Sequence, residues 1–206
     1  QDYFGSIPRG EKIVRNFPQE DPITKQINAK AYDPNIQIPA IITAYRTPSM
    51  KTRDSRILDM ISTYLSDGRS SVLYKKLVDT KKMALQAGAI NLSQEDYGTY
   101  IVYGLPLGET TLATLVKEID EEIVKMQTEL ISEKAYQKIQ NKFENNFVNA
   151  NSSIEGIANS LARYNVLYGD TNLINTENEI YRSITREEIR AVAKKYLNPN
   201  QRLILE

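Results

Sequence analysis

The chain has 206 residues, of which 41% are hydrophobic and 25% are charged, and its 26 basic side chains balance 26 acidic ones. This composition is typical of a folded protein of one or two domains. The balanced charge argues against a nucleic-acid partner, because phosphate binding needs a basic excess on one face. The longest mainly apolar stretch is residues 38–45. A membrane span needs about 20 such residues, so none is predicted.

Histidine and cysteine are both absent from the sequence. Zinc sites use imidazole or thiolate ligands, and histidine is the most frequent general acid or base in enzymes. The sequence also lacks the S-x-x-K, G-x-x-x-x-G-K-[ST] and G-x-G-x-x-G motifs, which removes a common serine-hydrolase pattern and the simplest nucleotide-binding loops. We therefore expect this chain to bind no metal and to carry no catalytic group of its own.

The N-terminal segment is punctuated by residues that break regular structure. Gly5, Pro8, Gly10, Pro18 and Pro22 all fall in it, and such spacing is typical of a connecting segment. We expect residues 1–22 to form an interdomain linker and residues 23–206 to form a single domain.

In the first half of the domain, alternating and periodic apolar residues predict strands and short helices. The predicted order is strand 26–31, strand 36–46, amphipathic helix 53–65, helix 70–80, and strands 83–92 and 99–105 around a hairpin loop.

The second half is predicted to be mainly helical. Helices are expected at 109–130, from a Ser132 cap to residue 147, around the apolar residues Ile154, Ile157, Ala158 and Leu161, and after a capping box at 185–188, before a last strand at 202–205. Strands followed by long helices and a returning strand predict an α+β fold, with helices covering one face of a mainly antiparallel sheet.

An acidic cluster lies opposite the apolar stripe of helix 109–130. It consists of Glu118, Asp120, Glu121 and Glu122. We interpret it as a solvated helix face rather than a calcium or acid/base site, since charge runs on amphipathic helices usually face water.

Several segments, taken in order, resemble the C-terminal domain of the pitrilysin or insulinase family of zinc peptidases, which includes the mitochondrial processing peptidases. They are YFGSIPRG at 3–10, ITAYRTPS at 42–49, the segment ILDMISTYLSDGRSSVLYKKLVDTKKMALQAGA at 57–89, ANSLARYNVLYGD at 158–170 and ITREEIRAVAKKYLNPNQRLIL at 184–205.

The resemblance implies that two similar α+β domains form half of a clamshell, which a second such half closes over a peptide or an unfolded segment. The family's zinc is held by an H-x-x-E-H helix of the first domain, so zinc is expected in the parent protein and not in this chain. The parent is then expected to be a zinc-dependent metalloendopeptidase whose C-terminal domain is inactive. A non-catalytic scaffolding or partner subunit of the same fold is the alternative. The compartment stays open, with the cell envelope or secretion preferred slightly to the cytoplasm.

The family's substrate-gripping half carries an R-x-x-x-x-x-x-Y pattern, and the resemblance places Val78 and Leu85 at its Arg and Tyr positions. Neither side chain donates a hydrogen bond. Two explanations stay open: this domain follows a zinc-bearing domain, which we favour, or it follows a degenerate one. The turn formed by Asp67, Gly68, Arg69 and Ser70 is the predicted contact with substrate or with the partner half.

Overall fold

The structure, a computed structural model, describes residues 3, 5–11, 13–14 and 21–206. Part of the predicted linker at 1–22 lies outside the described residues, and its described residues contain no helix or strand. The remainder builds a mixed sheet in the order β1-β5-β2-β4-β3. The strands are β1 (Ile27–Ala29), β2 (Ile41–Pro48), β3 (Ala84–Leu92), β4 (Tyr97–Pro106) and β5 (Arg202–Leu205).

Pairing within this sheet confirms that it is mainly antiparallel, as predicted. β2 pairs antiparallel with β4 and β5, and β3 pairs antiparallel with β4 in the predicted hairpin, whereas the short β1 pairs parallel with β5. The C-terminal strand therefore enters the sheet between two strands from the N-terminal part of the domain.

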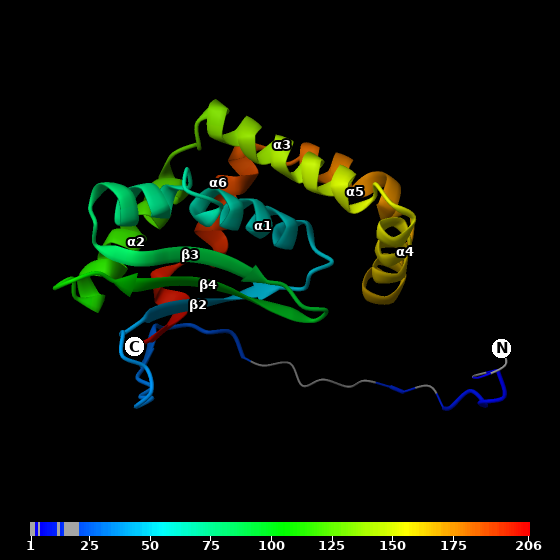
Figure 1. Cartoon of the computed structure of the whole chain (residues 1–206), viewed down its shortest axis with the longest axis horizontal. Helices are drawn as coiled ribbons and strands as arrows, with labels where there is room; N and C mark the ends of the chain where they lie inside the picture. Colours follow the sequence, from blue (N-terminus) through cyan, green and yellow to red (C-terminus); the bar gives the residue numbers. More distant parts are fainter. Residues whose placement is uncertain (1–2, 4, 12, 15–20) are drawn as a thin grey trace.

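Helices cover one face of the sheet, as predicted (Figure 1). The covering helices are α1 (Arg53–Ser66), α2 (Leu112–Thr128) and α6 (Arg186–Tyr196), and α3 (Glu133–Ala150) packs on α1 in a further layer. Their apolar stripes interdigitate with the inward residues of the strands, which accounts for most of the buried apolar side chains. Among the fully buried ones are Tyr45, Leu58, Ile61, Leu65, Leu77, Tyr100, Val102, Leu115, Ile119 and Ile189.

Three local predictions need correction. β2 begins at Ile41 rather than at residue 36, because Pro39 has no N–H to donate to a ladder. The helix expected at 70–80 is largely a π-helix, η1 (Tyr74–Thr80). A helix that the sequence did not predict, α5 (Leu173–Arg182), lies beside α3.

No helix of the described residues covers the opposite face of the sheet (Figure 1). Residues paired across strands share a face, and one transverse row runs from Ile27 through Leu203, Ala44 and Ile101 to Ile90. Ile27 is 45% exposed and Ile90 is 44% exposed. We call this surface the open sheet face and define it as Ile27, Ile42, Ala44, Ile90, Leu92, Ile101, Tyr103, Leu203 and Leu205.

The helix predicted around residues 154–161 is present as α4 (Ile154–Arg163), but its apolar stripe is not buried. None of the ten residues of α4 is buried. Ile154 is 89% exposed, while Ile157 and Leu161 are 40% and 38% exposed. In Figure 1, α4 follows α3 in the chain and lies apart from the helices that cover the sheet. We call Ile154, Ile157, Ala158 and Leu161 the α4 stripe.

The predicted capping box of α6 is present and predicts a pH dependence of stability. Glu188 accepts hydrogen bonds from the Thr185 N–H at 2.8 Å and from Arg53 Nε at 2.7 Å. The hydrogen bond and charge of Arg53, together with the Thr185 hydrogen bonds, outweigh the effect of burial and lower the pKa of Glu188 from 4.5 to about 2. A folded-state pKa below the unfolded value stabilises the fold above pH 4.5, and the contribution disappears as the pH falls toward about 2.

Glu188→Gln is therefore expected to lower the free energy of unfolding at pH 7 and to unfold at the same denaturant concentration as wild type near pH 2. Denaturant titrations at several pH values measure this difference. Glu187→Gln, at the neighbouring exposed position, is the control and should follow wild type. An equal loss for Glu188→Gln at every pH would contradict the assignment.

Candidate functional site

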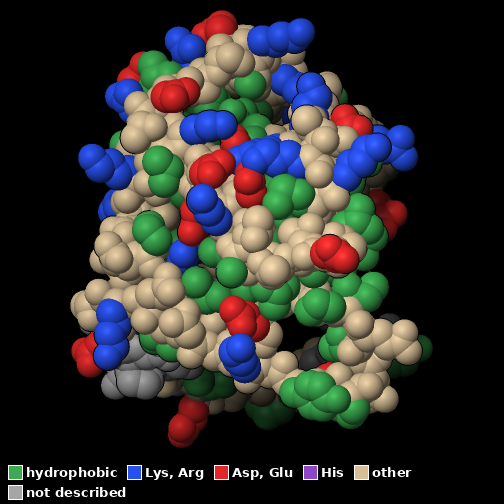
Figure 2. Space-filling view, turned by 90° about the vertical axis from the view of Figure 1, so that its left-hand side faces the viewer, with side chains coloured by type: hydrophobic (Ala, Val, Ile, Leu, Met, Phe, Trp, Pro, Cys, Tyr) green, Lys and Arg blue, Asp and Glu red, His purple; other side chains and the backbone are tan. Residues whose placement is uncertain are grey.

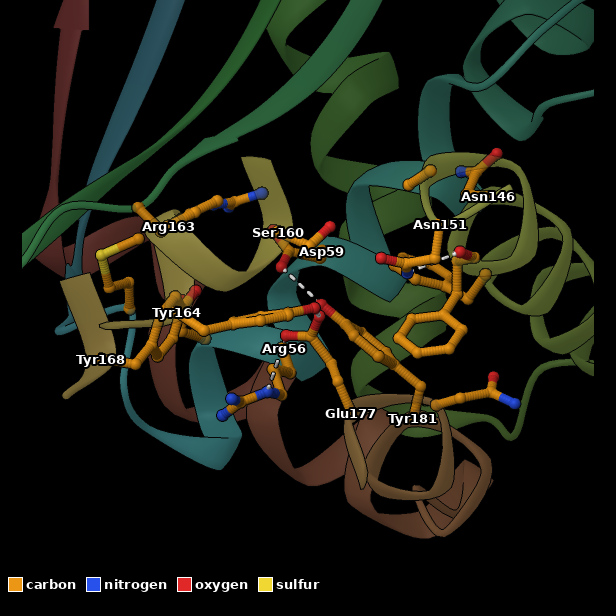
Figure 3. Close-up of a pocket in the computed structure, with 17 residues that line it drawn as sticks. Arg56, Asp59, Asn146, Asn151, Ser160, Arg163, Tyr164, Tyr168, Glu177 and Tyr181 are labelled. Carbon is orange, nitrogen blue, oxygen red and sulfur yellow. Dashed lines mark hydrogen bonds and ion pairs between the residues drawn. The ribbon is translucent and has the colours of Figure 1, made fainter. Parts of the chain in front are cut away.

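A polar cavity of about 240 Å³ lies where α1, α3, α4, α5 and the π-helix η2 (Tyr164–Tyr168) meet (Figure 3). Its ionisable lining comes from distant parts of the chain. Arg56 and Asp59 belong to α1, Tyr164 to η2, and Glu177 and Tyr181 to α5. Figure 3 shows Asp59, Tyr164, Glu177 and Tyr181 converging on the middle of the cavity.

Two carboxylates form the acidic side of this cavity. Asp59 accepts hydrogen bonds from Asn91 Nδ2 at 2.8 Å and from Tyr181 Oη at 3.1 Å. Burial raises the pKa of Asp59, and these two hydrogen bonds offset only part of that effect. Glu177 accepts a hydrogen bond from Tyr164 Oη. Neither carboxylate receives a hydrogen bond from a cation among the described residues.

Arg56 is the buried cation of the cavity and is only 7% exposed. Its guanidinium lies 5.6 Å from the centre of the Tyr168 ring, and its Nε is 3.8 Å from Glu177 Oε1. This separation is too long for a hydrogen bond, and Nε has no hydrogen-bond partner among the described residues. Asn151 Oδ1 is likewise buried without a partner there, although Asn151 Nδ2 donates to Phe147 O at 2.9 Å.

The side chains at this cavity can bind a polar ligand. Its lining contains arginine, carboxylate, amide and phenol groups but no histidine or cysteine. The part of the chain that the structure describes holds no group of three or more acidic side chains placed to hold a metal ion. Sequence reasoning missed this cavity, although Arg56 and Asp59, set among buried apolar residues of α1, were a usable signal.

The predicted contact turn follows α1 and is held against α3. Asp67 forms an ion pair with Lys142, and Ser70 Oγ accepts a hydrogen bond from Lys138. Gly68 adopts a left-handed φ of 73°, a conformation that favours glycine. Arg69 is exposed beside them. The turn is thus an ordered, exposed surface at some distance along α1 from the cavity, and its contact role stays a prediction.

The two positions that the resemblance aligned with the Arg/Tyr pair are placed differently. Val78 lies in η1 and packs against the core. Leu85 lies next to the irregularity at the start of β3 and is 47% exposed. Neither supplies a hydrogen-bond donor to the surface.

The acidic cluster of α2 is ion-paired, so the predicted solvated face is wrong in part. Lys76 Nζ lies 3.0 Å from carboxylate oxygens of Glu118, Glu121 and Glu122. Burial lowers the pKa of Lys76, but the hydrogen bonds to the three carboxylates outweigh it and raise the pKa overall. Because Lys76 belongs to η1 and the three carboxylates belong to α2, these ion pairs hold η1 against α2. On the face shown in Figure 2, basic and acidic side chains are interspersed.

These features define the class of protein: an α+β domain whose sheet is covered by helices on one face and whose described residues hold no group of three or more side chains placed to bind a metal ion. Comparison with known proteins identifies the family. Residues 1–143 match the model of the Peptidase M16 inactive domain, and the chain belongs to this family. The resemblance to the pitrilysin group and the fold expected from it are confirmed, as is the inactive nature of this domain.

Individual relatives agree with this assignment. The chain is 23% identical over 173 residues to the zinc protease PqqE of Helicobacter pylori, covering 84% of this chain and 39% of that protein. A protease from Helicobacter pylori matches with a TM-score of 0.90 at 22% identity, over 99% of this chain and 49% of its own. The periplasmic protease PqqL of Escherichia coli matches with a TM-score of 0.71 at 14% identity, over 88% of this chain and 20% of its own. The chain thus spans half or less of these relatives.

Proposed function

We propose that this chain is the non-catalytic C-terminal domain of a zinc-dependent metalloendopeptidase, and that the preceding domain binds the zinc through an H-x-x-E-H helix. Family membership supports this proposal, because the matched family is an inactive peptidase domain. The relatives that are named zinc protease or protease are about twice the length of this chain or longer. The chain's share in the reaction is to form part of a chamber wall.

The observation that carries this proposal is the pair of uncovered apolar surfaces, the open sheet face and the α4 stripe. A sheet face rich in apolar residues usually packs against another layer, and large exposed apolar patches mark interaction sites. This domain therefore needs a partner with matching surfaces. The preceding domain, which the resemblance implies to be similar in fold, is the occupant we propose for both surfaces.

Two domains of this fold can cover each other reciprocally. Each would offer a bare sheet face and a projecting helix with an apolar stripe, so the helix of one fits the sheet of the other. The α4 stripe has the i, i+3, i+4, i+7 spacing that lays one helix face on a flat surface. Such an arrangement buries both apolar surfaces at once and fixes the relative position of the two domains.

The remaining parts of the proposal concern substrate, second half and compartment. The substrate class is peptides and unfolded segments, because a closing chamber admits a chain more readily than a folded protein. The exposed turn of Asp67, Gly68, Arg69 and Ser70 is our proposed contact with substrate or with the second pitrilysin-type half.

A periplasmic or other envelope location is supported by the likeness to periplasmic PqqL. No helix in the described part of the chain is long and apolar enough to cross a membrane.

Metal analysis and peptide cleavage on the parent protein test this function. The parent is expected to hold about one zinc ion and to cleave unfolded casein, with activity lost on chelation and restored by zinc. The 206-residue chain assayed in parallel should bind no stoichiometric zinc and give no turnover. Chelator-sensitive cleavage by this chain alone, or a parent without bound zinc and without cleavage, would refute the proposal.

A further inference from the structure

The outer side of α3 carries a lysine at every fourth position, namely Lys134, Lys138 and Lys142. Residues four apart lie on the same side of a helix, and with a rise of about 1.5 Å per residue the three lysines span about 12 Å. In Figure 1, α3 lies in the outer layer of helices, away from the sheet. We call these three lysines the basic row. They line one hollow together with four amide side chains, those of Gln137, Asn141, Asn145 and Asn146.

Two of the three charges of the basic row have no acidic partner among the described residues. Lys142 forms an ion pair with Asp67 of the contact turn. Lys138 donates a hydrogen bond to the neutral Ser70 Oγ, and Lys134 pairs with no carboxylate in the described part of the chain. Lysines four residues apart on a helix repel each other, so a ligand that brings negative charge to the row relieves this repulsion.

The acidic side chains of α3 itself do not neutralise the basic row. Glu133 Oε2 lies 3.4 Å from Arg186 Nη2, and Glu144 Oε2 lies 2.6 Å from Arg182 Nη2. Because the charges of the whole chain balance, the row is a local excess of positive charge and not part of a generally basic protein. Electrostatic complementarity favours a partner that presents carboxylates to it.

A cavity of about 200 Å³ adjoins the basic row, between the end of α1, the contact turn and α3. Lys138 and Lys142 line both this cavity and the hollow on α3, so the two lie side by side. This arrangement suits an apolar side chain, and such anchors in pockets supply much of the binding energy at interfaces. The largely apolar part of its lining consists of Tyr64, Val72, Ala135 and Ile139.

We propose that this surface binds an extended, acidic segment of another polypeptide. In an extended chain every second side chain lies on the same side, about 6.6 Å apart, and one step of the basic row is about 6 Å. Carboxylates at alternate positions can therefore meet successive lysines, while an apolar side chain between them enters the cavity. The amides of the hollow can pair with the N–H and C=O groups of the segment. A nucleic acid supplies negative charge but no aliphatic side chain for the cavity.

This binding goes beyond peptide cleavage, because it needs neither zinc nor the preceding domain. It can be measured on the 206-residue chain alone, so a failure of the cleavage proposal leaves it standing. Each exposed ion pair contributes little by itself, and binding therefore depends on several carboxylates together with the apolar anchor.

Fluorescence anisotropy with labelled, end-blocked peptides tests the proposal. The probe ADADLDADA carries carboxylates at alternate positions and one leucine. ANANLNANA, in which amides replace the carboxylates, and ADADADADA, which lacks the leucine, are the matched controls. We expect ADADLDADA to bind with one molecule per chain and to bind more weakly as salt rises, since exposed charges are screened. ANANLNANA should bind at least tenfold more weakly, and ADADADADA several-fold more weakly.

Variants of the chain locate the site. Lys134→Gln combined with Lys138→Gln should weaken binding of ADADLDADA at least tenfold at an unchanged melting temperature. Lys117→Gln combined with Lys194→Gln makes the same change of charge at exposed positions of α2 and α6 and should bind like wild type. Ala135→Phe fills the cavity that Ala135 lines and should abolish the advantage of the leucine peptide over ADADADADA.

Four results would each overturn the proposal. They are no binding of ADADLDADA, equally tight binding of ANANLNANA or of a single-stranded oligonucleotide of equal charge, no advantage from the leucine in the wild-type chain, and wild-type binding by the folded Lys134→Gln, Lys138→Gln variant.

Discussion

Arg202→Met is expected to lower the free energy of unfolding by about 3–5 kcal/mol, the cost of breaking a buried ion pair by removing one partner. Arg202 begins β5 and is 4% exposed. Its Nη1 and Nη2 donate to the two carboxylate oxygens of Asp120 at 2.5 and 2.9 Å. Nη1 also donates to Tyr45 Oη at 3.2 Å, and Nε donates to Gln26 at 3.1 Å. One side chain thus joins β5 to α2, to β2 and to the segment before β1.

Urea unfolding measures this loss, and a double-mutant cycle separates its causes. Arg202→Met leaves the Asp120 carboxylate without its cation, whereas Arg202→Met combined with Asp120→Leu removes both charges. Apolar replacement of a whole buried pair is often close to neutral, so the double variant should be more stable than Arg202→Met alone. Lys125→Ala is the control: Lys125 is 59% exposed and Glu122 keeps its ion pair with Lys76, so this variant should cost less than about 1 kcal/mol. An Arg202→Met loss as small as the control's would show that the pair contributes little.

Elements with strong local signals were predictable from the sequence. The Thr185–Glu188 capping box, the β3–β4 hairpin and the closing β5 strand were confirmed, because caps and alternation act over a few neighbouring residues. α5 was missed because its segment LINTENEIYR is rich in polar residues and buries only Leu173. Its helix depends on packing against α3, which local sequence does not contain.

The candidate sites also divide into features encoded by neighbouring residues, which could be predicted, and contacts between distant segments, which could not. The contact turn at Asp67 could be located from its glycine and its polar residues, but the lysines of α3 that hold it could not. The cavity depends on Arg56 meeting Glu177, which is far away in sequence and lies on the unpredicted helix α5. A further limit concerns α4: the periodicity predicted its apolar stripe, but periodicity does not say whether the covering surface belongs to the same domain.

Ile154→Glu combined with Ile157→Glu is expected to reduce peptide cleavage by the parent protein at least tenfold while leaving this domain folded. Burying a Leu or Ile side chain is worth about 1.5–3 kcal/mol, and a carboxylate without a partner in an apolar interface adds a further cost. Loss of about 1.4 kcal/mol already weakens docking tenfold. The preceding domain would then lose its fixed position over the chamber.

Three measurements separate this effect from misfolding and from metal loss. The variant 206-residue chain should unfold at the wild-type urea concentration, because both side chains are exposed in it and exposed substitutions usually change stability by less than about 0.5 kcal/mol. The variant parent should retain its zinc, since the metal ligands lie in the other domain. Asn159→Glu, on the same helix but outside the α4 stripe, should cleave at the wild-type rate.

Wild-type cleavage by the double variant would show that the α4 stripe faces water in the parent as well. A destabilised variant chain would instead place the stripe in this domain's own core. The expected combination, a folded chain, a zinc-loaded parent and slow cleavage, is what an interface between domains produces and a purely structural helix does not.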